Sequence, residues 1–172
     1  YRLRMIEFIS VALTLMASSH SMPIYFDSSQ KKIARQVIDE AHKLGEDPHT
    51  LLAIAWHESR IQQGKTSHTG DVGIFQINWR FWGKKIWKYT SYKQFVEDMD
   101  NPEHATLAAV MVLREMRLYK TCRGINLYAC YNGGPAWMKS KNIDKIATYA
   151  RRVHRKRQQF LKGHKSWAQK KQ

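Results

Sequence analysis

The chain has 172 residues, enough for one domain with a single core, and its 43% apolar residues exclude global disorder. It carries 29 Lys and Arg against 14 Asp and Glu, and the resulting net charge of +15 indicates a polyanionic partner. Its two cysteines are too few for a disulfide-built miniprotein or a four-cysteine zinc site.

The first 21 residues have the pattern of a secretory signal peptide. Arg2 and Arg4 precede an apolar run over residues 8–17, and small residues follow this run. The run is too short to cross a bilayer as a helix, which needs about 20 apolar residues. The alternative is a buried N-terminal helix with Glu7 at its edge. We expect residues 1–21 to be removed and the protein to be exported.

Two helix signals follow this segment. Asp27 precedes an apolar stripe of helical period that ends at Gly45, which predicts a capped helix between them. Asp47-Pro48 then provides an N-cap and a first-turn proline for a second helix, which ends near Ser59.

Residues 64–90 differ from the rest, because four glycines in this segment break any helix, and residues 74–77 could form a short strand. Beyond them, Asn101-Pro102 begins a helix to about Tyr119 whose centre is apolar on every side, which predicts a buried central helix. Further helical pieces end at Gly133, and Asn142 caps a last helix. The sequence therefore predicts a mainly α domain with a short irregular β and loop insert.

The C-terminal end is strongly basic. No acidic residue follows Asp144, whereas residues 151–172 contain nine Lys and Arg. We divide the exported chain into a domain over residues 22–157 and a basic tail over residues 158–172. The tail is either a solvated helix end or an electrostatic anchor to an anionic wall or membrane.

Cys122 and Cys130 are predicted to form a disulfide bond. Export places them in an oxidising compartment, and closing so short a loop is worth about 2.5 kcal/mol on the chain-entropy model. The alternative is a pair of buried free thiols, which are common core residues.

Glu58 is the most informative carboxylate. At helical spacing it shares the apolar face of its helix with Leu51, Ile54 and Ala55. Core-facing glutamates are rare, because burying the charged form is costly. Burial raises a carboxyl pKa and suits the group for proton donation near neutral pH. The structural alternative is a glutamate in a salt bridge with Arg60 or a nearby lysine.

Two later segments carry polar side chains in Gly-rich surroundings. Residues 70–78 (Gly-Asp-Val-Gly-Ile-Phe-Gln-Ile-Asn) place Gln76 and Asn78 on one side of an extended segment, where their amides suit the hydroxyl and N-acetyl groups of a sugar chain. Tyr131-Asn132 lies at a helix end that glycine terminates. Each pattern alone also occurs by chance.

Together and in this order, the motifs resemble the catalytic domain of soluble lytic transglycosylases, relatives of goose-type lysozyme. The family pattern is Glu-Ser, Gly-Leu-Met-Gln-Ile, Ala-Tyr-Asn-x-Gly and a late Tyr. The matches are Glu58-Ser59, residues 73–77 with Phe75 in the Met place, residues 131–134 with Cys130 in the Ala place, and Tyr149 as the candidate for the late Tyr. The resemblance covers about residues 30–155.

The resemblance implies a lysozyme-like helical fold and cleavage of the MurNAc-β-1,4-GlcNAc bond of peptidoglycan, leaving a 1,6-anhydromuramyl end. Glu58 would protonate the glycosidic oxygen and then accept the proton of the muramyl C6 hydroxyl, which attacks C1. Asp71 would stabilise the transition state, position a water, or merely cap the turn at Gly70. The residues implied to bind the glycan are Ser59, Phe75, Gln76, Asn78, Tyr131, Asn132 and Tyr149.

The short chain and Asp71-Val72-Gly73 resemble small exported members that serve secretion or conjugation machines. We therefore expect a monomer in the periplasm or cell envelope that acts on glycan strands, with a secretion, conjugation or phage apparatus as a further partner. One alternative is a hydrolytic muramidase that uses Glu58 and Asp71. Another is a basic protein that binds nucleic acid or membrane, which explains the charge but not the ordered motifs.

Neither a metal nor a cofactor is expected. His57-Glu58 matches the start of a zinc-protease motif, but Ile61 stands where the second histidine is required. The polyanionic stem peptides of a wall polymer already account for the basic charge, so no specific nucleic acid is expected either.

Overall fold

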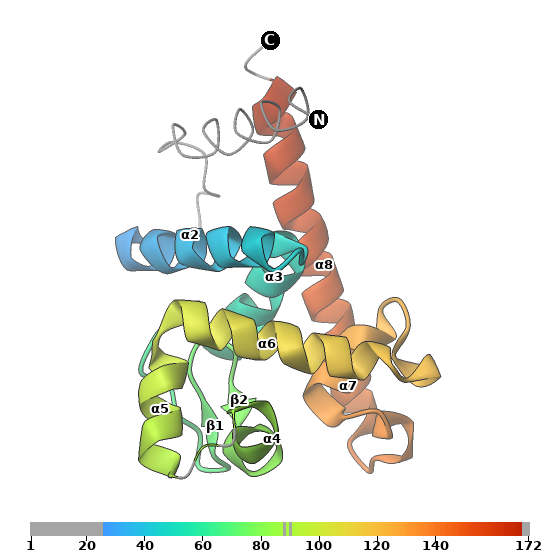
Figure 1. Cartoon of the computed structure of the whole chain (residues 1–172). Coiled ribbons are helices and arrows are strands. Elements are labelled where there is room, and N and C mark those ends of the chain that lie inside the picture. The colour runs from blue at the N-terminus through green and yellow to red at the C-terminus, as the bar shows by residue number, and fades with distance from the viewer. Residues whose placement is uncertain (1–25, 88, 90, 170–172) are drawn as a thin grey trace, which may run out of the picture.

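The structure is a computed structural model that describes residues 26–87, 89 and 91–169. The predicted signal peptide, residues 1–21, lies outside the described residues. The described chain is mainly helical with one short irregular insert, as the sequence predicts (Figure 1).

The first two helices begin as their capping residues dictate. Helix α2 spans Ser28–Lys43, and Asp27 and Gln30 close a reciprocal capping box at its start. Helix α3 spans Pro48–Ser59, with Asp47 as its N-cap. Asp47 also accepts a hydrogen bond from Arg157 Nε at 2.6 Å, which joins α3 to the last helix.

Helix α6, Pro102–Arg117, is the buried central helix. Its side chains from Ala105 to Met116 face the core on several sides, and the helix packs against α2, α3, α5 (Tyr92–Asp100) and α7 (Asn126–Gly133). Figure 1 shows α2 and α6 crossing the molecule, with α5 at one end of α6 and α7 toward the other. The core therefore lies around α6, and the insert and α7 are held at its two ends.

The insert contains more helix and less strand than predicted. Strands β1 (Asp71–Val72) and β2 (Ile77–Asn78) form a two-residue antiparallel ladder, so the strand begins at Ile77 and not at Ile74. The segment Trp79–Gly83 is a π-helix that continues as α4, Lys84–Trp87, where glycines were expected to exclude helix. Asn78 starts this turn by accepting hydrogen bonds from the backbone N–H groups of the next residues.

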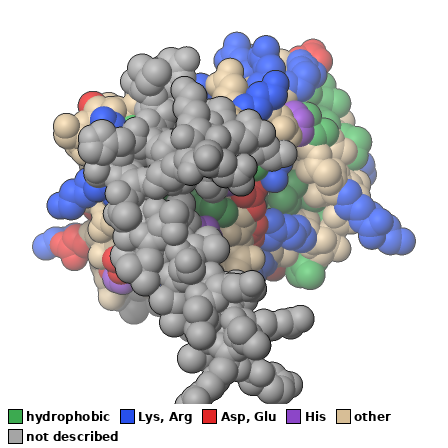
Figure 2. All heavy atoms as spheres, turned by 90° about the horizontal axis from the view of Figure 1, so that it is seen from above, with side chains coloured by type: hydrophobic (Ala, Val, Ile, Leu, Met, Phe, Trp, Pro, Cys, Tyr) green, Lys and Arg blue, Asp and Glu red, His purple; other side chains and the backbone are tan. Residues whose placement is uncertain are grey.

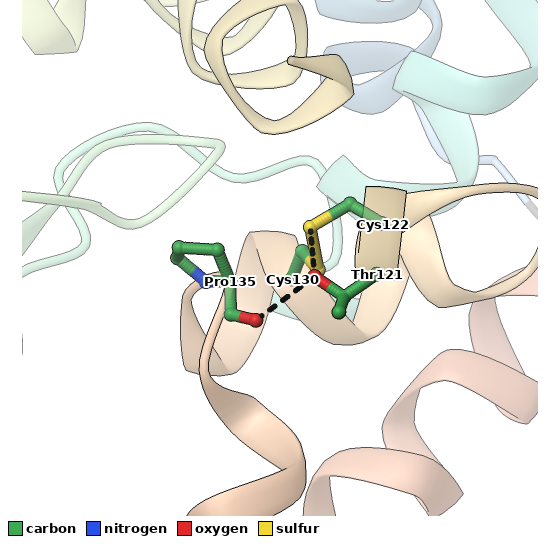
Figure 3. The surroundings of a disulfide bond; sticks show 4 residues. All are labelled: Thr121, Cys122, Cys130 and Pro135. Carbon is green, nitrogen blue, oxygen red and sulfur yellow. Dashed lines mark hydrogen bonds between the residues drawn. A yellow bond between two sulfur atoms is a disulfide. The ribbon is translucent and has the colours of Figure 1, made fainter. Parts of the chain in front are cut away.

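The predicted disulfide between Cys122 and Cys130 is present (Figure 3). It joins the 3₁₀ turn Lys120–Cys122 to helix α7. Thr121 Oγ1 also donates a hydrogen bond to the carbonyl of Pro135 at 3.1 Å, so two links hold the turn against the residues around α7.

Helix α8, Ile143–Gln169, packs against α3 and α7 and extends beyond the other elements (Figure 1). It crosses the predicted boundary between residues 157 and 158 without a break. Phe160, which the sequence assigned to the tail, is only 7% exposed, and its ring centroid lies 5.8 Å from that of Phe26. At least this first part of the predicted tail packs on the domain.

Candidate active site

Glu58 lies in the last turn of α3, where α3 packs against α8. Its Oε1 accepts a hydrogen bond from Tyr149 Oη of α8 at 2.5 Å. Burial raises the pKa of the Glu58 carboxyl to about 7, the Tyr149 hydrogen bond opposes this rise, and the negative charge of Asp71 adds to it. A carboxylic acid with this pKa holds its proton for much of the time at neutral pH and can donate it.

The chain turns sharply after Glu58. Arg60 and Ile61 have φ values of 60° and 58°, in the left-handed region that a β-branched side chain rarely adopts. Ile61 is fully buried, so its packing offsets this strain. Ser59 is also buried and donates to the carbonyl oxygen of Ile74 at 2.9 Å. The end of α3 is thereby tied to the Gly73–Gln76 turn.

This turn depends on Gly73. Its φ is +76°, and a Cβ at this position would lie 2.2 Å from the carbonyl oxygen of Met99, so only glycine fits. The following Phe75 is fully buried, and its carbonyl oxygen accepts a hydrogen bond from Tyr131 Oη of α7 at 2.9 Å. Burial, with the nearby charges of Glu58 and Asp71, raises the pKa of Tyr131 well above its ordinary value.

Asp71 of β1 is held in a hydrogen-bond network. Its Oδ2 accepts from Ser67 Oγ and Thr69 Oγ1, each at 2.6 Å, and its Oδ1 accepts from Asn78 Nδ2 at 2.7 Å. Partial burial acts to raise the pKa of Asp71, but these donors outweigh it and hold the pKa below its ordinary value. Asp71 is therefore a fixed carboxylate with little basicity.

The two amides of the insert do not lie as predicted. Asn78 is in β2, but Gln76 has a φ of +49° and belongs to the turn, so the two side chains do not project from one extended segment. Gln76 Nε2 donates to the carbonyl oxygens of Lys65 and Gly73 at 3.1 and 2.9 Å. The amide nitrogens of both residues thus bind the protein's own loop, and Asn132, at the end of α7, is exposed.

The structure brings most of the predicted residues together. Tyr149, 91 residues from Glu58 in sequence, bonds to it directly, and Tyr131 lies near both carboxylates. Ser67 and Thr69 were not predicted, although their alternation with Asp71 is a visible signal for an acceptor held by hydroxyl groups.

Trp56 also contributes to this end of α3. Arg60 Cζ lies 5.0 Å and Lys156 Nζ 4.9 Å from the centroid of its ring, so two cations contact the indole. Among the described residues, no group of three or more His, Cys, Asp or Glu side chains could hold a metal ion.

These features define a lysozyme-like helical domain in which Glu58 is a buried carboxyl group that holds a proton near neutral pH. A family model, the transglycosylase SLT domain, matches residues 35–152, and the chain belongs to this family. No curated protein and no solved structure matches the chain. The family identifies a lytic transglycosylase that acts on peptidoglycan, which fits an exported or envelope location. None of the described helices is long and apolar enough to cross a membrane.

Proposed function

We propose that this protein cleaves the MurNAc-β-1,4-GlcNAc bond with Glu58 as the only acid and base, and that it leaves 1,6-anhydromuramyl ends. Protonated Glu58 gives its proton to the bridging oxygen, and the bond from this oxygen to C1 breaks. The C6 hydroxyl of the muramyl residue then attacks C1, and the Glu58 carboxylate accepts the hydroxyl proton. No water is consumed, and Glu58 returns to its starting state.

The observation that carries this proposal is the contrast between the two carboxyl groups. Glu58 has a pKa of about 7 and suits both proton transfers, whereas three donors hold Asp71 as a weakly basic carboxylate. A hydrolytic inverting enzyme needs a second carboxylate that activates water. Asp71 suits this task poorly. Its fixed negative charge instead stabilises the positive charge that develops at C1, and it also raises the pKa of Glu58.

The remaining residues position these groups or line the site. Tyr149 orients the Glu58 carboxyl and stabilises its charged form. Ser59, Phe75 and Tyr131 fix the Gly73–Gln76 turn beside it. Because the side chains of Ser59 and Phe75 are buried, we assign them this supporting role and not glycan contact. Glycan contact is assigned to Asn132 and to the faces of Gln76, Asn78 and Tyr149 that remain exposed.

Mass spectrometry of muropeptides released from purified sacculi tests the proposal. The wild type should release products that are one water lighter than hydrolysis products, and Glu58→Gln should release almost none. Products with a free reducing MurNAc end would instead establish the muramidase alternative. Asp71→Asn separates the two mechanisms further, since the transglycosylase variant should still form anhydro products, more slowly, whereas a muramidase would lose its base.

We also propose that the enzyme opens the wall locally for a secretion, conjugation or phage machine. The Asp71-Val72-Gly73 motif supports this role by its resemblance to small members of that kind. A strain that carries Glu58→Gln should assemble the machine less efficiently but should grow with a normal wall. A general growth or division defect would contradict the local role.

A further inference from the structure

The segment that precedes helix α7 presents apolar side chains to solvent. Leu118 is 77% exposed, Tyr119 40% and Ile125 39%, and all three lie within eight residues of one another. The disulfide at Cys122 fixes the middle of this segment against α7. We call residues 118–125 the disulfide loop. Because the disulfide holds the loop in place, the exposed apolar residues occupy fixed positions on the surface.

The surroundings of the disulfide loop are positively charged. No Asp or Glu lies between Glu115 and Asp144. Residues 116–172 hold 15 of the 29 Lys and Arg but one of the 14 acidic residues, so they carry +14 of the net +15. Within the loop, Lys120 and Arg123 are exposed, and in the described part of the chain neither forms an ion pair with a carboxylate.

An open basic cavity lies beside the loop. It has a volume of about 330 Å³ and is lined by Ile125 of the loop and by Arg151, His154 and Arg155 of α8. Two arginines beside one apolar side chain suit a phosphate group attached to an apolar body, and one of them, Arg151, also donates a hydrogen bond to Thr148 Oγ1 at 2.8 Å. Figure 2 shows Lys and Arg side chains at several places on the face seen from above, so positive charge is spread over this face.

This surface is distinct from the candidate active site. Tyr149, which bonds to Glu58, and Arg151, which lines the cavity, are two residues apart on α8. Two residues correspond to about 200° of rotation around a helix, so these side chains leave α8 on opposite sides. A ligand on the cavity side therefore leaves Glu58 accessible to glycan.

We propose that the disulfide loop and the adjoining cavity dock the protein on an anionic phospholipid surface. Leu118, Tyr119 and Ile125 enter the boundary between headgroups and acyl chains, Lys120 and Arg123 contact the lipid phosphates, and the cavity receives one phosphate headgroup. Fixed apolar side chains among unpaired cations suit this interface, because a bilayer surface offers an apolar layer directly below its anionic layer. A hydrated wall polymer supplies anions alone and gives no partner for an exposed Leu118.

Vesicle flotation of the full chain measures the predicted contribution. Each cation near an anionic surface contributes about a five-fold change in partitioning, so Lys120→Gln with Arg123→Gln should weaken binding to phosphatidylglycerol vesicles about 25-fold. The matched control, Lys32→Gln with Arg35→Gln, removes one lysine and one arginine at the same spacing from exposed positions of α2 and should have little effect. Neutral phosphatidylcholine vesicles should bind all variants weakly.

The apolar contribution is tested separately. Leu118→Ser should weaken binding about ten-fold at low and at high salt, because burial of a leucine does not depend on ionic strength. Phe81→Ser removes an aromatic side chain of similar exposure, 74%, from the π-helix and serves as the control. All loop variants should cleave soluble glycan fragments at the wild-type rate, which shows that they fold.

Hydrogen exchange locates the contact independently of the other basic segments. Amides of residues 118–125 should exchange more slowly when phosphatidylglycerol vesicles are added. Unchanged exchange there, or equal vesicle binding by the loop and control variants, would overturn the proposal. Loop variants that lose binding to sacculi but keep binding to vesicles would assign the surface to the wall polymer and would also overturn it.

Discussion

Replacement of Glu58 by glutamine should make the protein more stable, by an amount that depends on pH. Burial raises the pKa of Glu58 from an ordinary 4.5 to about 7. Between these two values the folded protein holds a proton that the unfolded chain releases, so the free energy of unfolding falls as pH rises through this window. The destabilisation is absent below about pH 4.5 and fully developed above about pH 7.

The magnitude follows from the size of the shift. Each pKa unit corresponds to 1.36 kcal/mol, so a rise from 4.5 to about 7 corresponds to roughly 3 kcal/mol at alkaline pH. Glutamine has the same shape, cannot ionise, and its side-chain carbonyl can still accept the hydrogen bond from Tyr149. Glu58→Gln should therefore gain about 3 kcal/mol at pH 8 and almost nothing at pH 4.

Urea unfolding of both proteins at pH 4 and pH 8 checks this expectation. In thermal scans the gain at pH 8 should appear as a rise in Tm of about 6 °C or more for a domain of this size. Glu97→Gln, which removes an exposed carboxylate on α5, is the control and should change stability by no more than about 0.5 kcal/mol at either pH. An equal effect of Glu58→Gln at both pH values would refute the claim that Glu58 is buried at a cost.

Three further predictions concern two residues that interact with Glu58 and one buried residue of helix α8. Tyr149→Phe removes the hydrogen-bond donor that opposes the rise in the pKa of Glu58. The fall of kcat/KM at alkaline pH should therefore shift to higher pH by about one unit, and a shift to lower pH would contradict this role. Asp71→Asn removes the charge that raises the same pKa, so the fall should move to lower pH, and an unmoved profile would show that the two carboxyl groups do not interact. Phe160→Ala should lower the free energy of unfolding by about 3 kcal/mol in urea, since the ring is buried. An unchanged midpoint would show that this part of α8 is a solvated tail.

Local signals in the sequence were sufficient for the helices that begin at caps. Asp27, Asp47-Pro48 and Asn101-Pro102 predicted the starts of α2, α3 and α6, because a capping side chain satisfies the free N–H groups of the first turn within three residues. The disulfide was also predictable, because only two cysteines are present and export favours their pairing. The ordered motifs identified the family for a similar reason, since they are short and contiguous.

The insert could not be derived from local signals in this way. Glycines were expected to prevent helix in residues 64–90, yet Asn78 caps a π-helix, and Gly83 lets the ring of Trp79 approach the backbone: a Cβ there would lie 2.1 Å from this ring. The left-handed conformation of Gln76 places it in a turn and not in the predicted extended segment. The turn depends in addition on a distant contact, the approach of Met99 to Gly73.

What the sequence by itself determined is the set of chemical groups: Glu58 on an apolar helix face, Asp71 among glycines, and two tyrosines that follow much later. Only the tertiary structure decided which carboxyl group holds a proton near neutral pH and which stays charged. The packing of α8 on α3 brings Tyr149 to Glu58 and removes water from its carboxyl group, which raises its pKa. Asp71 instead receives three hydrogen bonds from its own loop and stays charged. Desolvation and hydrogen bonding depend on the complete surroundings of a group, and residues far apart in the chain supply these surroundings.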